Sequence, residues 1–260
     1  MSVIQASASA LSPAELDAFR ADGFLVVRRL ASADVCREMR QLTLRHLAEA
    51  QLPIEYEADT HYPGAPSALD VPGGRTIRRL LQAYARDAVF RQWVESPELG
   101  DRLRQLLGGP IALSQAHHNC VMTKQPAFSS VTGWHQDIRY WAFERPELVS
   151  AWLALGTENV DNGCLRVVPG SHLSAFEREQ YDDALFFRTD RDDNRQMLAR
   201  QVPVMLEPGD VLFFHCRLLH AAGRNATAVP KLAAVFTFYR QDNHALPDTR
   251  SASLPGVSLG

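Results

Sequence analysis

The chain has 260 residues, of which 46% are hydrophobic, a length and composition typical of a packed globular protein with one sizeable domain or two small ones. Its formal charge of -3 at pH 7 excludes the excess of basic residues with which proteins bind nucleic acid or anionic membranes. Because the first residues lack the pattern of a signal peptide and no long apolar run occurs, we expect a soluble protein of the cytoplasm.

The chain begins with a predicted helix followed by a strand. Ser12 is a suitable N-cap, Pro13 suits the first helical position, and Glu15 has the spacing that completes a capping box. Gly23 is expected to end this helix. The β-rich run FLVVRRL at 24–30 then predicts a short strand.

A second helix is predicted from Ser32, which is again a suitable N-cap for the periodic segment that follows. Residues 52–74 are rich in proline and glycine, which predicts an irregular loop. Residues 76–108 return to helical periodicity. We therefore expect the first half of the chain to be mostly helical.

The second half of the chain is predicted to be β-structure. From Ile111 on, short β-branched and aromatic runs alternate with turn signals such as DNG at 161–163 and EPGD at 207–210. This pattern is typical of a sandwich or a barrel. Residues 178–196 interrupt the strands with dense charge, and we interpret them as a solvated surface excursion, with a lid over the site as the alternative.

The motif GWHQDIRYW at 133–141 places a histidine and an aspartate one residue apart. Side chains at i and i+2 of a strand share a face, so a strand over 131–138 would point His135 and Asp137 together and Gln136 away. That geometry offers one imidazole and one carboxylate to a single metal ion. The short pattern arises often by chance, so its weight depends on a third ligand.

A further histidine from the C-terminal part would complete a metal site. Two histidines and one carboxylate are the ligands of non-haem Fe(II) oxygenases, in which coordination positions stay open. The segment GDVLFFHCRLLHAAGRN offers His215 and His220, which would lie on opposite faces of an unbroken strand, so only one of them can serve. Zinc is the rival metal, because three protein ligands and a water also form catalytic zinc sites.

Three ordered segments of the second half resemble the phytanoyl-CoA dioxygenase family of Fe(II)- and 2-oxoglutarate-dependent oxygenases. They are WHQDIRYW, SAWLALGTENVDNGCLRVVPGSH at 150–172, and VPVMLEPGDVLFFHCRLLHAAGRN at 202–225. The segment LSPAELDAFRADGFLVVRRLASADV is similar to the first helix and strand of the family. The resemblance covers nearly the whole chain except residues 52–75 and 178–200.

The resemblance implies a mainly β fold with flanking helices, namely a double-stranded β-helix (jelly-roll, cupin-like) core with N-terminal helices packed on it. Residues 1–260 would form a single domain, with a mostly helical lead-in at 1–110 and the β-helix core at 111–245. It also implies His135, Asp137 and His220 as the catalytic iron ligands. His220 matches the family's distal histidine because it precedes a pair of small residues and an asparagine.

The resemblance further implies which residues hold the cosubstrate 2-oxoglutarate. The family binds the far carboxylate with a cation that is normally an arginine, and this chain has Lys231 there. A lysine lacks the planar fork of an arginine but still binds a carboxylate. Arg224 is the alternative cation, and Ala222 replaces a serine that the family tends to have. The other predicted cosubstrate-binding residues are Trp152, Lys124 and His117.

His117 and His118 are neighbours in a predicted strand and are expected to point in opposite directions. We therefore expect that they do not form a metal site together. One of them, taken to be His117, is expected to line the cosubstrate pocket.

The implied reaction is the hydroxylation, or desaturation, of a small organic molecule by dioxygen, with release of succinate and CO2. Because Asp137 is present, no ligand position is vacant for chloride, which disfavours halogenation. Two alternatives stay open. One is a related metal enzyme that does not use 2-oxoglutarate, which is motivated by Lys231 and Ala222, and the other is a non-catalytic jelly-roll that binds a ligand or partner.

Overall fold

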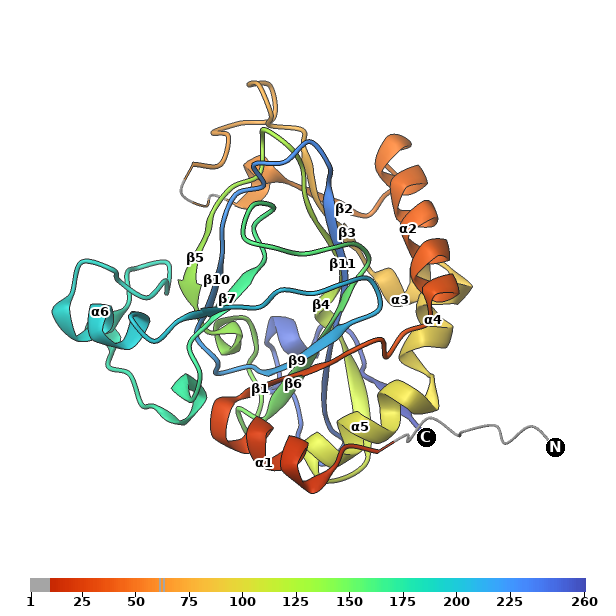
Figure 1. Cartoon of the computed structure of the whole chain (residues 1–260), viewed down its shortest axis with the longest axis vertical. Helices are drawn as coiled ribbons and strands as arrows, with labels where there is room; N and C mark the ends of the chain where they lie inside the picture. Colours follow the sequence, from red (N-terminus) through yellow and green to blue (C-terminus); the bar gives the residue numbers. More distant parts are fainter. Residues whose placement is uncertain (1–9, 61, 63) are drawn as a thin grey trace.

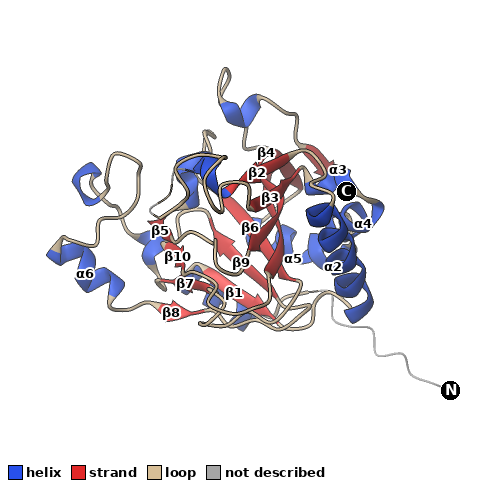
Figure 2. Cartoon of the chain, turned by 90° about the horizontal axis from the view of Figure 1, so that it is seen from above, coloured by secondary structure: helices blue, strands red, loops and turns tan. Residues whose placement is uncertain are grey.

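The computed structural model describes residues 10–60, 62 and 64–260, which form two antiparallel β-sheets with helices packed outside (Figures 1 and 2). In spatial order the larger sheet contains β1 (Phe24–Val27), β9 (Val211–His215), β6 (Leu148–Ala154), β11 (Lys231–Arg240), β4 (Ile111–Lys124), β3 (Ile77–Leu81) and β2 (Ile54–Tyr56), and β12 (Val257–Leu259) pairs with β4. The smaller sheet contains β5 (Thr132–His135), β10 (His220–Ala222), β7 (Leu165–Val167) and β8 (Val202–Pro203). The predicted jelly-roll class is confirmed.

The helices gather mainly in the first half of the chain, as predicted. The α-helices are α1 (Pro13–Asp22), α2 (Ala33–Ala48), α3 (Ala83–Arg86), α4 (Ala88–Val94), α5 (Pro97–Leu107) and α6 (Asp192–Leu198). Short 3-10 helices are η1 (Glu57–Thr60), η2 (Asp137–Tyr140), η3 (Ser171–Leu173), η4 (Arg178–Gln180) and η5 (Arg250–Ala252). None of the helices in the described residues is long and apolar enough to span a membrane.

Helix α1 begins and ends at the residues that its sequence indicates. The hydroxyl of Ser12 accepts a hydrogen bond from the N–H of Glu15 at 3.3 Å, and the Glu15 carboxylate accepts one from the N–H of Ser12 at 2.7 Å. These two bonds form the predicted capping box. Gly23 ends the helix in the left-handed conformation, with φ of 79°.

Two short strands occupy segments that were predicted otherwise. The expected loop at 52–74 contains β2. The segment 76–108, expected to be helical, begins with β3 and then contains the helices α3, α4 and α5. Strand β3 pairs with β4, so that Leu80 lies opposite Val121. The helical prediction for this part was wrong because pairing with a distant strand outweighs local periodicity.

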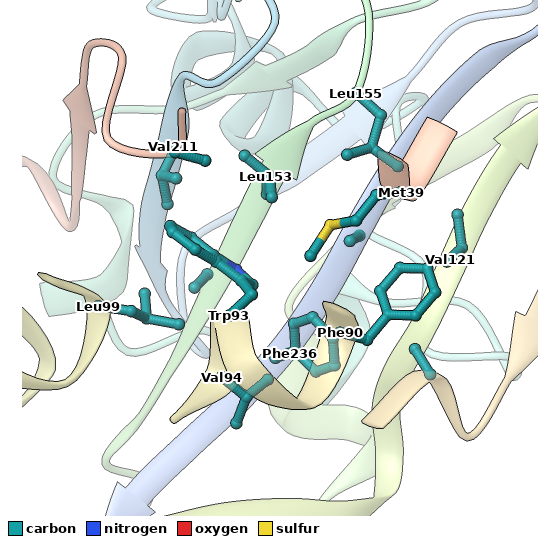
Figure 3. Packing of buried hydrophobic residues seen from close by; sticks show 14 of the residues in the cluster. Met39, Phe90, Trp93, Val94, Leu99, Val121, Leu153, Leu155, Val211 and Phe236 are labelled. Atoms are coloured by element: carbon teal, nitrogen blue, oxygen red, sulfur yellow. The ribbon is translucent and has the colours of Figure 1, made fainter. Parts of the chain in front are cut away.

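One face of the larger sheet packs against the helices. Figure 3 shows Met39 of α2 and Phe90 and Trp93 of α4 against Val121 of β4 and Phe236 of β11. Burial of such large apolar side chains contributes about 1.5 to 3 kcal/mol each. In Figure 2, α2 and α4 lie on the side of the larger sheet opposite to the smaller sheet.

The other face of the larger sheet is directed toward the smaller sheet. Along β11, Ala233 and Val235 pack on this side, and Lys231 shares their face because side chains alternate along a strand. The same alternation places Lys124 of β4 and Trp152 of β6 between the sheets. Three of the predicted cosubstrate residues therefore line the same inner space.

Candidate metal centre and adjoining cavity

The three predicted metal ligands come together between the two sheets. His135 is the last residue of β5, Asp137 is the first residue of η2, and His220 is the first residue of β10. The Nε2 atoms of both histidines lie 3.4 Å from Oδ1 of Asp137. One ligand atom from each residue lies within 4.8 Å of the others, so the three residues are placed to hold one metal ion.

Hydrogen bonds on the far side of each ring orient the two imidazoles. Nδ1 of His135 lies 2.8 Å from the carbonyl oxygen of Gly133, and Nδ1 of His220 lies 3.0 Å from that of Leu218. Because a carbonyl only accepts, Nδ1 carries the proton and the lone pair of Nε2 is directed into the site. Both oxygens of Asp137 are buried and accept no hydrogen bond from the described residues. A buried carboxylate that accepts no hydrogen bond, beside two imidazole nitrogens, fits a metal cation.

Burial and neighbouring charges set the protonation of the three ligands. Burial, followed by repulsion from His220, lowers the pKa of His135 to about 4. Burial alone would raise the pKa of Asp137, but His118 and His220 hold it well below its usual value. Burial lowers the pKa of His220, but the Asp137 carboxylate outweighs this effect and raises it. Asp137 is therefore ionised at neutral pH, the form that binds a metal.

The local backbone differs from the uninterrupted strands that the sequence suggested. Strand β5 ends at His135, but Gln136 keeps an extended conformation, with φ of -109° and ψ of 134°, so His135 and Asp137 still point to one side. The amide of Gln136 points away and donates to the carbonyl of Arg217. A turn separates β9 from β10, and His215 packs on His172 with ring centres 5.4 Å apart, outside the metal cavity.

His117 and His118 point to the same side, contrary to the prediction. Ser114 and Asn119 lie opposite Thr237 and Phe236, two neighbours on β11, so residues 115–118 bulge out of the strand pairing. Both imidazoles pack on one indole, that of Trp141, with ring centres 5.5 and 5.0 Å apart.

The bulge brings His118, rather than the predicted His117, to the metal site. Nδ1 of His118 lies 3.3 Å from Oδ2 of Asp137. His117 instead lines a neighbouring cavity of about 210 Å³, of which His118 forms a shared wall. Burial, together with the charge of Arg250, lowers the pKa of His117 to about 3, so this ring is neutral.

The metal cavity contains most of the predicted cosubstrate residues. Lys124, Trp152 and Lys231 line it together with the three metal ligands. Ala222 also lines it, at the position where a serine was expected. Arg224, the alternative cation, is exposed and does not line this cavity.

Glu158 is a buried residue that contacts two residues of the cavity lining, and the sequence did not indicate it. Its Oε2 accepts a hydrogen bond from Nζ of Lys231 at 2.9 Å, and its Oε1 accepts one from Nε1 of Trp152 at 2.8 Å. Nζ of Lys231 also lies 4.9 Å from the centre of the Trp152 ring. No local pattern marks Glu158, because its partner is 73 residues away in the chain.

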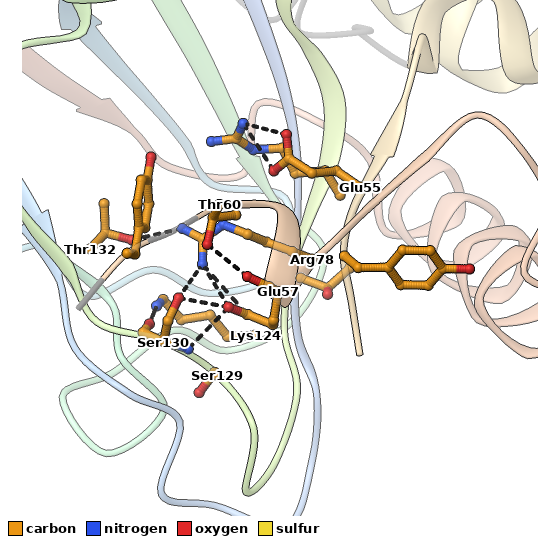
Figure 4. A network of polar contacts seen from close by, with 12 residues as sticks. Glu55, Glu57, Thr60, Arg78, Lys124, Ser129, Ser130 and Thr132 are labelled. Atoms are coloured by element: carbon orange, nitrogen blue, oxygen red, sulfur yellow. Dashed lines mark hydrogen bonds and ion pairs between the residues drawn. The ribbon is translucent and has the colours of Figure 1, made fainter. Parts of the chain in front are cut away.

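A second buried ion pair lies beside Lys124 (Figure 4). Nη1 of Arg78 lies 3.2 Å from a Glu57 oxygen and donates to the hydroxyl of Ser130 at 2.7 Å. The hydroxyl of Ser130 donates in turn to Glu57 at 2.6 Å. Nζ of Lys124 donates to the carbonyl of Ser130 at 2.9 Å. Arg78 and Glu57 therefore neutralise each other.

Aromatic residues from two distant loops pack beside the metal centre. The rings of Tyr62 and Phe186 meet edge to face with centres 5.2 Å apart, and Phe186 lies 5.8 Å from the His135 ring. The hydroxyls of Tyr62 and Tyr140 are 2.8 Å apart, and the Arg139 guanidinium lies 4.3 Å from the Phe186 ring centre. Both loops belong to the segments that the family resemblance leaves out.

The segment 178–196 thus has two sides. Its charged residues form exposed pairs such as Arg188 with Asp190 at 2.7 Å, as expected of a surface excursion. Phe186 and Phe187 are buried, and the N–H of Phe187 donates to the carbonyl of Trp134 at 2.6 Å. The segment therefore contacts His135 through Phe186 and presents its charges to solvent.

Comparison with known proteins agrees with this arrangement. The family model of phytanoyl-CoA dioxygenase matches residues 19–233. The probable phytanoyl-CoA dioxygenase of Caenorhabditis elegans is 30% identical over 158 residues, which cover 56% of this chain and about half, 49%, of that protein. The ectoine dioxygenase of Halomonas elongata is 29% identical over 254 residues, which cover 91% of this chain and 72% of that protein.

A solved structure shares the fold. It is that of the epimerase SnoN in complex with Fe3+, alpha ketoglutarate and nogalamycin RO, with a TM-score of 0.73 and 23% identity over 95% of this chain and 94% of that one. Because the family model spans most of the sequence, the chain belongs to the phytanoyl-CoA dioxygenase family.

Proposed function

We propose that this chain is an Fe(II)- and 2-oxoglutarate-dependent oxygenase that hydroxylates, or desaturates, a small organic molecule and releases succinate and CO2. The observation that carries the proposal is the cluster of His135, Asp137 and His220, whose ligand atoms lie within 4.8 Å of one another. Two histidines and one carboxylate would hold Fe(II) and leave positions open for the 2-oxo acid and dioxygen. When bound, iron and the 2-oxo acid would supply the activation of dioxygen.

Residues around the three ligands would orient them and exclude water. The carbonyls of Gly133 and Leu218 hold the two imidazoles in the tautomer that leaves Nε2 unprotonated. His118 contacts the carboxylate oxygen of Asp137 that the other two imidazoles leave free. Phe186, whose ring meets that of His135 edge to face, would limit the access of water to this ligand.

The charges of the cavity match a doubly charged cosubstrate. Around its far end, the cations Lys124, Lys231 and Arg78 face two carboxylates, Glu57 and Glu158, which leaves one positive charge unmatched. At the metal end, Asp137 would leave one positive charge of Fe(II) unmatched. A 2-oxo acid with a second carboxylate supplies one negative charge at each end, and 2-oxoglutarate has this structure.

A zinc hydrolase, the rival reading of the three ligands, fits the cavity less well. Zinc enzymes that activate water commonly use a carboxylate or a similar group as a general base beside the metal. Within the described part of the chain, Asp137 is the only carboxylate that lines the metal cavity. Glu57 and Glu158 are held in ion pairs outside it.

An anaerobic titration tests the proposal. Fe(II) is added to the metal-free protein and 2-oxoglutarate to the Fe(II) protein, while the visible charge-transfer band of the chelate is recorded. We expect one Fe(II) per chain and a band that saturates with 2-oxoglutarate. Iron binding without the band would contradict the cosubstrate assignment, and no iron binding would contradict the enzyme.

The substrate is then sought among small organic molecules. Each candidate is incubated with the Fe(II) protein, 2-oxoglutarate and air, and mass spectrometry scores the gain of one oxygen or the loss of two hydrogens. Succinate formed in proportion to product would link the two half-reactions. Product without succinate would favour the related enzyme that does not use 2-oxoglutarate.

A further inference from the structure

The chain contains only two lysines, Lys124 and Lys231, beside 25 arginines. They lie opposite each other on the paired strands β4 and β11. Both are buried, with exposed fractions of 6% and 5%, and both line the metal cavity. Burial of two ammonium groups side by side costs free energy, so the pair needs a compensating anion.

The two lysines differ in how they are compensated. Lys231 is fully paired, because Glu158 accepts its hydrogen bond at 2.9 Å and is itself held by the indole N–H of Trp152 at 2.8 Å. Lys124 has as its hydrogen-bond acceptor the neutral carbonyl of Ser130, at 2.9 Å. The carboxylate nearest to Ser130, that of Glu57, is already paired with Arg78 (Figure 4).

Glu158 does not line the cavity. Its side chain has an exposed fraction of 0%, and it lies behind Lys231 and Trp152, which do line the cavity. A bound molecule would therefore touch Lys231 without touching Glu158. Any influence of Glu158 on binding must act through the charge and position of Lys231.

We propose that Glu158 is a positioning residue that neutralises Lys231, so that Lys124 supplies the unmatched charge for the anionic end of the cosubstrate. The proposal rests on the function proposed above, and it states which of the two lysines in the cavity is neutralised and which one binds the cosubstrate. Glu158 then limits how strongly the cavity prefers a 2-oxo acid that ends in a carboxylate over one that ends in an alkyl group.

The test compares two 2-oxo acids on the anaerobic Fe(II) protein. 2-Oxoglutarate carries the second carboxylate, and 2-oxopentanoate has the same chain length without it. The charge-transfer band reports the Kd of each, and the ratio of the two Kd values measures how much the cavity gains from the distal charge. A general loss of structure weakens both ligands and leaves this ratio unchanged.

Three variants separate the roles of the two lysines. K124M should weaken 2-oxoglutarate about tenfold to a hundredfold, the effect of one charge-assisted hydrogen bond, and change 2-oxopentanoate little. E158Q removes the negative charge and keeps one acceptor oxygen, which serves either Trp152 or Lys231, so the charge of Lys231 is released and 2-oxoglutarate should bind about tenfold more tightly. The double variant E158Q/K231M should keep the ratio of the unmodified protein.

E207Q is the matched control, because it removes the same charge from an exposed residue that bonds to Thr157. It should leave both Kd values unchanged. The double variant also covers the case in which E158Q alone does not fold, because it removes the buried pair as a whole.

The proposal is overturned if E158Q/K231M loses the preference for 2-oxoglutarate while K124M keeps it, since Lys231 would then be the anchor. It is also overturned if E158Q changes neither Kd. Absence of the band with both 2-oxo acids in the unmodified protein is a different result, which contradicts the proposed function itself and with it the role of Glu158.

Discussion

The two ends of the metal cavity are both buried, but each carries an uncompensated charge, and the two charges have opposite sign. At the metal end, Asp137 is a carboxylate without a hydrogen-bond donor, flanked by two imidazole lone pairs. At the far end, Lys124 is a cation without a carboxylate. One end lacks a cation and the other lacks an anion.

This difference indicates what the cavity is built to hold. An unpaired charge in the interior destabilises a protein, so two of opposite sign in one cavity are expected only where a ligand compensates both. The other charges nearby are matched in pairs, as in Arg78 with Glu57 and Lys231 with Glu158. Among the described residues that line the cavity, Asp137 and Lys124 are the two without an oppositely charged Lys, Arg, Asp or Glu partner, and they lie where the proposed ligand would bind.

The largest expected effect is at the metal end. Asp137→Ala removes the one charged ligand, which at a buried site costs on the order of 3 to 5 kcal/mol. The Kd for Fe(II) should rise more than about a hundredfold, measured by anaerobic titration and by iron content after gel filtration. Asp190→Ala, at an exposed pair with Arg188, is the control and should bind iron normally. If both variants bound Fe(II) equally well, Asp137 would not be a metal ligand.

The adjacent histidines test how the bulge supports the metal end. His118→Phe removes the ring nitrogen 3.3 Å from Asp137, and loss of such a supporting contact typically weakens a metal about tenfold to a hundredfold. His117→Phe changes a ring that lines the neighbouring cavity and should leave the Kd for Fe(II) within about twofold. Equal effects of the two variants would show that the contact with Asp137 is not what matters.

The affinity for 2-oxoglutarate should depend on pH through Lys124. Burial, reinforced by Arg78 and Lys231 and opposed by Glu57 and Glu158, lowers the pKa of Lys124 well below the ordinary value for lysine. The charged form binds a carboxylate, so the affinity for 2-oxoglutarate is highest below this pKa and falls as pH rises above it, by up to about tenfold per pH unit.

The Kd for 2-oxoglutarate, measured anaerobically across the alkaline range, checks this prediction. The decline should begin at a pH at which an ordinary lysine is still charged, and it should be absent in K124M. The Kd for 2-oxopentanoate, which lacks the distal carboxylate, should follow the pH much less. A decline that persists in K124M would assign the titration to another group.

The smallest effect is expected far from the cavity. Ser12→Ala removes the capping box of α1 and should lower the free energy of unfolding by about 1 kcal/mol. Thermal or urea unfolding measures this loss, while the Kd for Fe(II) and the Kd for 2-oxoglutarate should stay unchanged. Altered cosubstrate binding in this variant would show that stability and site are coupled, which would weaken conclusions drawn from the cavity variants.

Much of the site could be predicted because its signals are local or ordered along the chain. His135 and Asp137 share a side through an extended backbone, and the motif order indicated His220 as their partner. The resemblance to the family, rather than strand alternation, indicated Lys124 and Lys231 as cosubstrate-binding residues. Caps such as that of Ser12 depend on residues three positions apart, so they too could be predicted from the sequence.

The rest depends on contacts between segments that are distant in the chain. Three features depend on register and loop packing: the pairing of Glu158 with Lys231, the bulge that turns His118 toward Asp137, and the contact of Phe186 with His135. By itself the sequence determined the residue types, their periodicity and the ends of the first helix, because these follow from interactions over a few residues. Only the tertiary structure decided which charges neutralise one another, because electrostatic compensation depends on distance in space and on burial.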